Sequence, residues 1–226
     1  MNSKEIIFFS DLEGTLVGEN GEFDEENFYK FCKELQCLAD KTNSKVSIVI
    51  VSPLGPTYMT KYMDKMDRSI LLMERQCPER KNTVEIVAGA ADFNDIPIEI
   101  NDRIDRRIDE LRGVRTRSGS LGTDAKLDYI SGYIKTQEEQ VRQHLRNKSF
   151  YIYAGNGKND VGAIEYVNKL KNGLTITPAN TVPKVERIAE VKSNLDGVLG
   201  ITDCIKQIRM TRLEKDKTEL DEKEND

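Results

Sequence analysis

The stretch Ile6-Ile7-Phe8-Phe9-Ser10-Asp11-Leu12-Glu13-Gly14-Thr15-Leu16 decides the fold that the sequence predicts. Four apolar residues are followed at once by two carboxylates, two positions apart, and then by Gly-Thr. A short bulky apolar run that ends in turn residues favours a buried strand. Since the loops after parallel strands open onto the ligand crevice of α/β proteins, Asp11 and Glu13 could supply a nucleophile and a general acid–base. An ordinary strand-to-loop junction with acidic turn residues is the alternative.

A second buried strand is predicted at residues 46–51, Val-Ser-Ile-Val-Ile-Val, which are apolar on both faces as a central parallel strand requires. This strand ends at Ser52-Pro53, and a helix is predicted from about residue 56 to residue 66. Ser52 therefore occupies the place that Asp11 occupies in the first strand. Its hydroxyl could hold a phosphoryl oxygen or serve as a simple turn hydroxyl.

A third strand-to-loop junction is predicted within residues 150–164, where a glycine-rich turn leads into a helix that begins near Asn159 and Asp160. Backbone N–H groups and polar side chains at such a turn can bind an anion or a cation. Lys126 lies in the first turn of a helix predicted at 125–134. A lysine there is unfavourable for the helix dipole unless an anion is near, although a solvated lysine is equally compatible with the pattern.

Residues 69–120 give the weakest pattern. Short strands are predicted at 70–73 and 84–87, and a helix at 102–112 carries several arginines among acidic residues. This helix is either a salt-bridged solvated face or an arginine cluster that faces a phosphate. A second polar helix, at 137–146, contains the only histidine, His144, which is expected on the surface.

Composition sets limits on the class of protein. The 226 residues, of which 38% are hydrophobic and 32% charged, suit one domain with an insertion, or one large and one small domain. A net charge of -5 argues against a general nucleic-acid binder. The N-terminal apolar run is too short for a signal peptide, and no apolar stretch reaches the length of a membrane span. The four cysteines form no CxxC pair, so we expect reduced thiols in a cytoplasmic protein with no membrane or nucleic-acid partner.

The order of these motifs resembles that of haloacid dehalogenase (HAD) superfamily phosphatases. The first motif matches residues 11–15, the second Ser52, the third Lys126 and the fourth residues 155–160, and the resemblance covers residues 5–67 and 121–209. It is closest to the branch with a cap between motifs two and three (Cof-like or sucrose-phosphatase-like). The resemblance implies an α/β fold: a Rossmann-like parallel sheet flanked by helices, formed by residues 1–68 and 121–212. It also implies a small α+β cap at 69–120. The charged residues 213–226 could prolong the last helix for a turn or two and are expected to form a frayed or disordered tail.

The resemblance implies a phosphomonoester hydrolase that forms an aspartyl-phosphate on Asp11, with Glu13 as general acid and base. Ser52 and Lys126 would neutralise the phosphoryl oxygens. The implied substrate-binding set is Gly14, Thr15, Ser52, Pro53, Lys126 and Asn159. Mg²⁺ would be held by Asp11, the Glu13 carbonyl, Asn156 and Asp160. The expected substrate is a small phosphorylated metabolite, with sugar phosphates among the candidates; the oligomeric state is not predicted.

Two residues depart from the family pattern. The acid–base position is usually aspartate, but some family members, including enolase-phosphatases, resemble this chain in having glutamate there. Asn156 stands where the family normally has a metal-binding aspartate, so it brings an oxygen but no negative charge. Two hypotheses follow: a magnesium-dependent phosphatase with weakened activity, or a module that binds a phosphorylated ligand or a protein partner without turnover.

Overall fold

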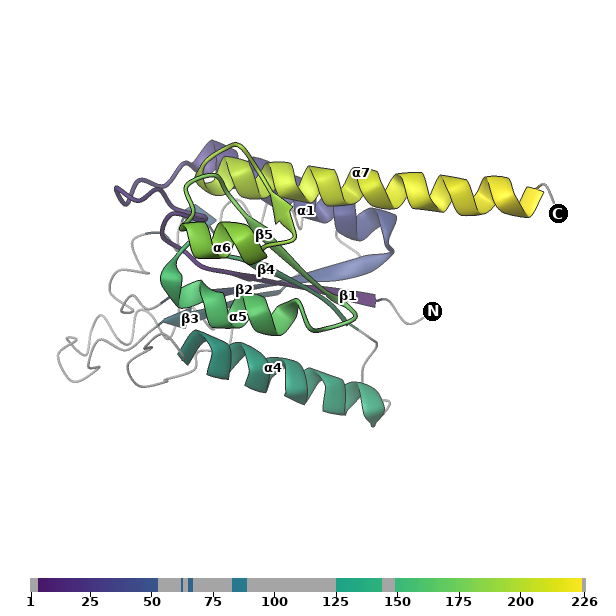
Figure 1. Cartoon of the computed structure of the whole chain (residues 1–226), viewed down its shortest axis with the longest axis horizontal. Coiled ribbons are helices and arrows are strands. Elements are labelled where there is room, and N and C mark those ends of the chain that lie inside the picture. The colour runs from purple at the N-terminus through teal and green to yellow at the C-terminus, as the bar shows by residue number, and fades with distance from the viewer. Residues whose placement is uncertain are drawn as a thin grey trace.

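A parallel β-sheet organises the chain in the computed structural model, which describes residues 4–52, 62, 65–66, 83–88, 125–143 and 149–224 (Figure 1). The described part contains six strands, which lie in the spatial order β3 (Thr83–Ala88), β2 (Ser44–Ser52), β1 (Lys4–Ser10), β4 (Ser149–Ala154), β5 (Gly173–Thr177) and β6 (Val191–Lys192). All neighbouring strands pair in parallel. The predicted α/β fold with a Rossmann-like parallel sheet is therefore confirmed.

Residues 6–9 of the central strand β1 are all apolar because both faces of the sheet are covered. Phe8 pairs with Ile48 of β2 on one side and with Ile152 of β4 on the other. Ile6 and Phe8 belong to the core on one face, whereas Ile7 and Phe9 belong to the core on the opposite face. This two-sided burial explains why the run lacks the polar alternation of a half-exposed strand.

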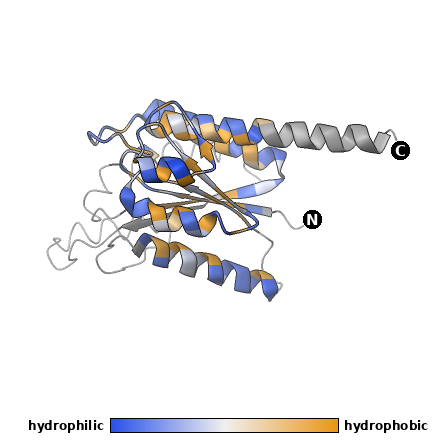
Figure 2. Ribbon diagram, viewed as in Figure 1, coloured by the Kyte–Doolittle hydropathy of each residue, from blue (hydrophilic) through white to orange (hydrophobic). Residues whose placement is uncertain are grey.

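Helices cover both faces of the sheet (Figure 1). Helices α1 (Glu25–Lys41) and α7 (Gly197–Glu224) pack on one face, and α4 (Ala125–Arg142) and α5 (Val161–Val167) on the other. The short helix α6 (Pro183–Ile188) adds Val185 to the second core. Hydrophilic residues lie along the outer surfaces of these helices (Figure 2). The Asp24 carboxylate caps α1 by accepting from the Asn27 N–H at 3.0 Å.

Two element predictions need correction. The helices predicted at 125–134 and 137–146 are one helix, α4, because no glycine or proline interrupts residues 133–142 and Gln137 is buried. The strand predicted at 84–87 is present, but it is β3 of the core sheet, in register with β2, and not part of a cap. Tyr62, Lys65 and Met66 are helical, as predicted, whereas His144, the rest of the predicted helix 56–66 and the rest of residues 69–120 lie outside the described residues.

The charged C-terminal segment also differs from the prediction. Helix α7 continues through Glu224 and projects beyond the sheet, although a disordered tail was predicted from residue 213 (Figure 1). Its residues are strong helix formers, and Lys215, Glu219 and Lys223 are spaced four apart with alternating charge. Among the described helices, none is both long and apolar enough to cross a membrane.

Candidate active site

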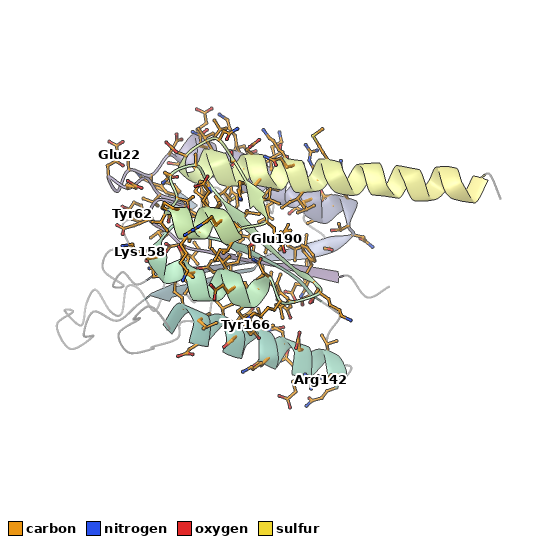
Figure 3. All side chains as sticks on the ribbon, in the orientation of Figure 1. Glu22, Tyr62, Arg142, Lys158, Tyr166 and Glu190 are labelled. Atoms are coloured by element: carbon orange, nitrogen blue, oxygen red, sulfur yellow. The ribbon has the colours of Figure 1, made fainter. Side chains whose placement is uncertain are left out.

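The polar residues predicted for function gather at the carboxyl ends of β1 and β4. At this point the chain leaves β1 toward α1 on one face of the sheet and leaves β4 toward α5 on the other, the arrangement at which α/β folds place their ligand sites. The Asp11 N–H donates to the Ala154 carbonyl at 2.9 Å and so ties the two strand ends together. Glu22, Tyr62 and Lys158 mark this end of the molecule, whereas Arg142, in the last turn of α4, lies at the other end (Figure 3).

The centre of the candidate site is a buried lysine between two carboxylates. The Lys126 Nζ lies 2.7 Å from Asp11 Oδ1 and 2.7 Å from Asp160 Oδ1. The side chain of Lys126 is only 1% exposed, so it is not the solvated lysine that the sequence allowed. Because these residues come from the end of β1, the start of α4 and the start of α5, the fold joins three motifs that are far apart in the chain.

Asp160 is fixed by hydrogen bonds to both of its oxygens. Oδ1 accepts from Lys126 and from the Tyr153 hydroxyl, each at 2.7 Å. Oδ2 accepts from the backbone N–H groups of Asn156, at 3.0 Å, and Gly157, at 2.8 Å. A carboxylate offers about four acceptor positions, so this fully buried group is saturated. In this structure Asp160, which the sequence predicts as a metal ligand, uses these acceptor positions for hydrogen bonds within the chain.

The charges of this cluster do not cancel when both carboxylates are ionised. Burial raises the pKa of Asp11 to about 7; the charge of Asp160 adds to this shift, and Lys126 opposes it. Burial alone would lower the pKa of Lys126, but Asp11 and Asp160 raise it above its ordinary value. Lys126 is therefore cationic, and two carboxylates share one positive charge. The site as described lacks one positive charge.

A network of amides joins the loop after β1 to the loop after β4. The Thr15 hydroxyl donates to Asn156 Oδ1 at 3.2 Å, and Asn156 Nδ2 donates to the Asn180 carbonyl at 3.2 Å. Asn180 Nδ2 in turn donates to the Gly14 carbonyl at 2.9 Å. Gly14 has φ of +69°, and a Cβ at this position would collide with the Asn156 amide. Asn156 thus packs directly against the loop that carries Asp11.

The oxygen atoms at this point fit a hard divalent cation, with less negative charge than the family pattern supplies. In the described structure, Asp11 Oδ2 and the Glu13 carbonyl accept no hydrogen bond, and Asn156 Oδ1 accepts only from Thr15. No group of three His, Cys, Asp or Glu side chains suited to a metal is found among the described residues. Mg²⁺ is often bound by only one or two carboxylates together with waters and substrate phosphate, so oxygens of this kind could hold it.

The remaining predicted residues occupy the same edge of the sheet. Ser52 is fully buried at the end of β2, Glu13 is half-buried in the loop after β1, and Asn159 is half-buried in the single turn of 3-10 helix η2 (Lys158–Asp160). Pro53 and the arginines of residues 103–117 lie outside the described residues. The sequence interpretation missed Tyr153, which reads as a core residue of a strand, and assigned no role to Asn180.

Comparisons with known proteins give structural similarities only. No protein-family model matches the sequence, and no curated protein is significantly similar to it. A cobalt-bound deoxy-D-mannose-octulosonate 8-phosphate phosphatase from Haemophilus influenzae is 14% identical over 93% of this chain and 88% of its own, with a TM-score of 0.44. A 3-deoxy-D-manno-octulosonate 8-phosphate phosphatase from Yersinia pestis is 13% identical over 92% of this chain and 83% of its own, with a TM-score of 0.36. At these low values, we base the function on the residues of this chain.

Proposed function

We propose that this chain is a HAD-type phosphomonoester hydrolase that acts with Mg²⁺ on a small phosphorylated metabolite. One observation carries the proposal: the buried Lys126 ammonium bridges Asp11 and Asp160 at the carboxyl ends of two parallel strands. A buried ion cluster is expensive to maintain in a protein core, and a fold that needed only stability would be served as well by apolar residues. Clusters of this kind are typical of sites that handle charge.

The proposed reaction has two steps. The Asp11 carboxylate attacks the phosphorus, the bond from phosphorus to the ester oxygen breaks, and Glu13 gives its proton to the leaving oxygen. Glu13 then takes a proton from water, whose oxygen attacks the aspartyl-phosphate, so that Asp11 is regenerated and inorganic phosphate leaves. The half-buried position of Glu13, in the same loop and two residues from Asp11, suits a group that exchanges protons with solvent.

The positive charge of Lys126 is placed to stabilise the phosphoryl group during transfer. The Lys126 ammonium has three N–H donors and uses two of them on Asp11 and Asp160, which leaves one for a phosphoryl oxygen. The hydroxyl of Ser52, the Gly14-Thr15 turn and Asn159 complete the proposed phosphate-binding set. When bound to Asp11, the Glu13 carbonyl and Asn156, Mg²⁺ supplies the charge that offsets repulsion between carboxylate and phosphate. We assign Asp160 to hold Lys126 in place of its predicted metal role.

The substrate beyond its phosphate is proposed only as a class. Residues 69–120, without the strand β3, remain our proposed α+β cap, and sugar phosphates remain among the candidate substrates. The alternative function is a module that binds a phosphorylated ligand or protein without turnover. The observation that favours this alternative is Asn156, whose amide is engaged by Thr15 and Asn180 and adds no charge for a metal.

A phosphatase assay separates the two functions. We expect release of inorganic phosphate from at least one member of a panel of phosphorylated sugars and other metabolites, dependent on added Mg²⁺ or Mn²⁺ and abolished by EDTA. Circular dichroism of the same sample shows whether it is folded. A folded protein that hydrolyses no member of a broad panel would contradict the enzyme proposal and leave the binding module.

The Asn156→Asp variant tests the proposed metal site. A carboxylate oxygen in place of Nδ2 would face the Asn180 carbonyl and lose a hydrogen bond, so the metal-free variant should be about 1–2 kcal/mol less stable than wild type. Mg²⁺ should restore this stability, and the Mg²⁺ concentration for half-maximal rate should fall about tenfold because a charge is added beside the cation. Thermal unfolding and turnover, each measured across a Mg²⁺ titration, check both effects.

The matched control for this variant is Asn20→Asp, which adds the same charge at an exposed position. Asn20 Oδ1 only accepts from the Glu22 N–H, a role that a carboxylate can also fill. We expect no change in stability or in metal requirement. An Asn156→Asp variant whose Mg²⁺ dependence matches wild type would remove Asn156 from the metal site.

A further inference from the structure

The hydroxyl of Tyr153 is directed at the ion cluster from within the sheet. Tyr153 lies in β4, is fully buried, and donates to Asp160 Oδ1 at 2.7 Å. The same oxygen accepts from Lys126. A phenylalanine could fill the same space in the core, so packing alone does not require the hydroxyl.

Asp160 is held from three parts of the fold, and Tyr153 is one of them. The N–H groups of Asn156 and Gly157 fix Oδ2, and the Tyr153 hydroxyl and Lys126 share Oδ1. If the hydroxyl were lost, Oδ1 would keep Lys126 as its only partner, and the carboxylate could rotate about its last torsion. Lys126 has a flexible four-carbon stem, so its ammonium would follow Asp160 and move away from Asp11.

We propose that Tyr153 is a positioning residue: acting through Asp160, its hydroxyl holds the Lys126 ammonium against Asp11. The proposal rests on the proposed phosphatase function for its kinetic consequence, because a displaced ammonium would stabilise the transferring phosphoryl group less well. Its structural part, the coupling of Tyr153 to Lys126, does not depend on activity.

Tyr151 is a buried tyrosine in the same strand that does not contact the ion cluster, so it serves as the comparison for Tyr153. It lies two residues earlier in β4, faces the same core as Tyr153 and is 1% exposed. Burial raises the pKa of both phenols, but the strongest charge acting on Tyr151 is that of Glu138, whereas on Tyr153 it is that of Asp160. Tyr151→Phe therefore removes a buried hydroxyl from the same strand and face without touching the ion cluster.

The test compares Tyr153→Phe with Tyr151→Phe by hydrogen exchange in NMR, without metal or substrate. We follow the Lys126 ammonium, identified by its loss in Lys126→Arg, and the Asn156 and Gly157 amides. Tyr153→Phe should speed their exchange about tenfold relative to wild type, since a hydrogen bond to a charged group is worth about a factor of ten. Tyr151→Phe should leave these rates within about twofold of wild type.

Kinetics supply the second readout. With an active wild type, Tyr153→Phe should lower kcat about tenfold and leave KM within about twofold, because the lost interaction acts in the transition state. If the exchange rates in Tyr153→Phe match those in Tyr151→Phe, the proposal is overturned and Tyr153 contributes only to core packing. An inactive wild type would overturn the proposed function alone, since the exchange result decides the role of Tyr153 by itself.

Discussion

Asp11→Asn is expected to reduce phosphatase turnover by roughly 10³-fold or more, because an amide is not a competent nucleophile. The substitution preserves the shape of the side chain, and an amide oxygen can still accept from the Leu12 N–H and from Lys126, which bond Oδ1 in the wild type. The loss should therefore appear in kcat without unfolding. Steady-state turnover with saturating metal and the circular dichroism spectrum of the variant check this result.

The same variant should be more stable than wild type at neutral and alkaline pH. Burial raises the pKa of Asp11 from 3.8 to about 7, so above about pH 7 the folded wild type carries an ionised group that is favoured in the unfolded chain. Below about pH 3.8 the group is protonated in both states and contributes no difference. A neutral asparagine lacks this penalty, so its advantage should grow as pH rises between these values. We expect a gain of about 1–3 kcal/mol at pH 8.

Denaturant unfolding in EDTA at pH 4 and pH 8 measures this gain. Asp128→Asn is the matched control, since Asp128 lies on the exposed face of α4, and we expect little change at either pH. Asp11 would be excluded as the nucleophile if Asp11→Asn kept most of the wild-type turnover. If the variant is no more stable than wild type at pH 8, the ionised Asp11 carboxylate does not destabilise the folded protein.

The sequence was sufficient to predict the strands that form the centre of the sheet and the place where the site forms. Strands buried on both faces are apolar throughout, which identifies residues 6–9 and 46–51 without any alternation. Because parallel strands end at one edge, motifs at the ends of β1 and β4 must converge there. Asp11 and Lys126 are thus in contact although more than 100 residues separate them.

Side-chain partners within that site could not be predicted in the same way. Asp160 was predicted to bind metal because it is an acid near a glycine-rich turn, but its direction depends on hydrogen bonds from Tyr153 and Lys126, which no local pattern records. Tyr153 itself has the pattern of a core residue. Asn180 contacts the loop after β1 only because the fold brings β5 next to β4.

Two boundaries differ from the prediction, each for its own physical reason. The strand β3 was assigned to a cap since residues 84–87 lie in a polar, irregular stretch, whereas its place is set by pairing with the edge of β2. The end of α7 was predicted as disordered because it has almost no apolar residues to bury, whereas helix propensity and alternating charge favour the helix that is observed. For β3, pairing with a neighbouring strand outweighed the hydrophobic pattern. For α7, helix propensity outweighed it.

Lys126→Met is expected to have the second large effect, on stability and on turnover together. The substitution keeps an apolar stem but removes the ammonium that two buried carboxylates share. Uncompensated buried charge should lower the free energy of unfolding by about 3–5 kcal/mol at pH 8. Turnover should fall by roughly 10²–10³-fold, as expected when a group that stabilises the transferring charge is lost.

The destabilisation by Lys126→Met should depend on pH with a definite sign. Lys126 lowers the pKa of Asp11, so without the ammonium that pKa should rise further in the folded variant. The variant should therefore lose stability as pH rises from about 4, the ordinary pKa of an aspartate in the unfolded chain, through the raised pKa of Asp11. Unfolding free energies of variant and wild type should therefore approach each other near pH 4. Lys135→Met, at an exposed position of the same helix, should change stability by less than about 0.5 kcal/mol at any pH. Equal effects of the two substitutions would mean that Lys126 is an ordinary helix lysine, and the ion cluster could then carry neither the proposed catalysis nor the role of Tyr153.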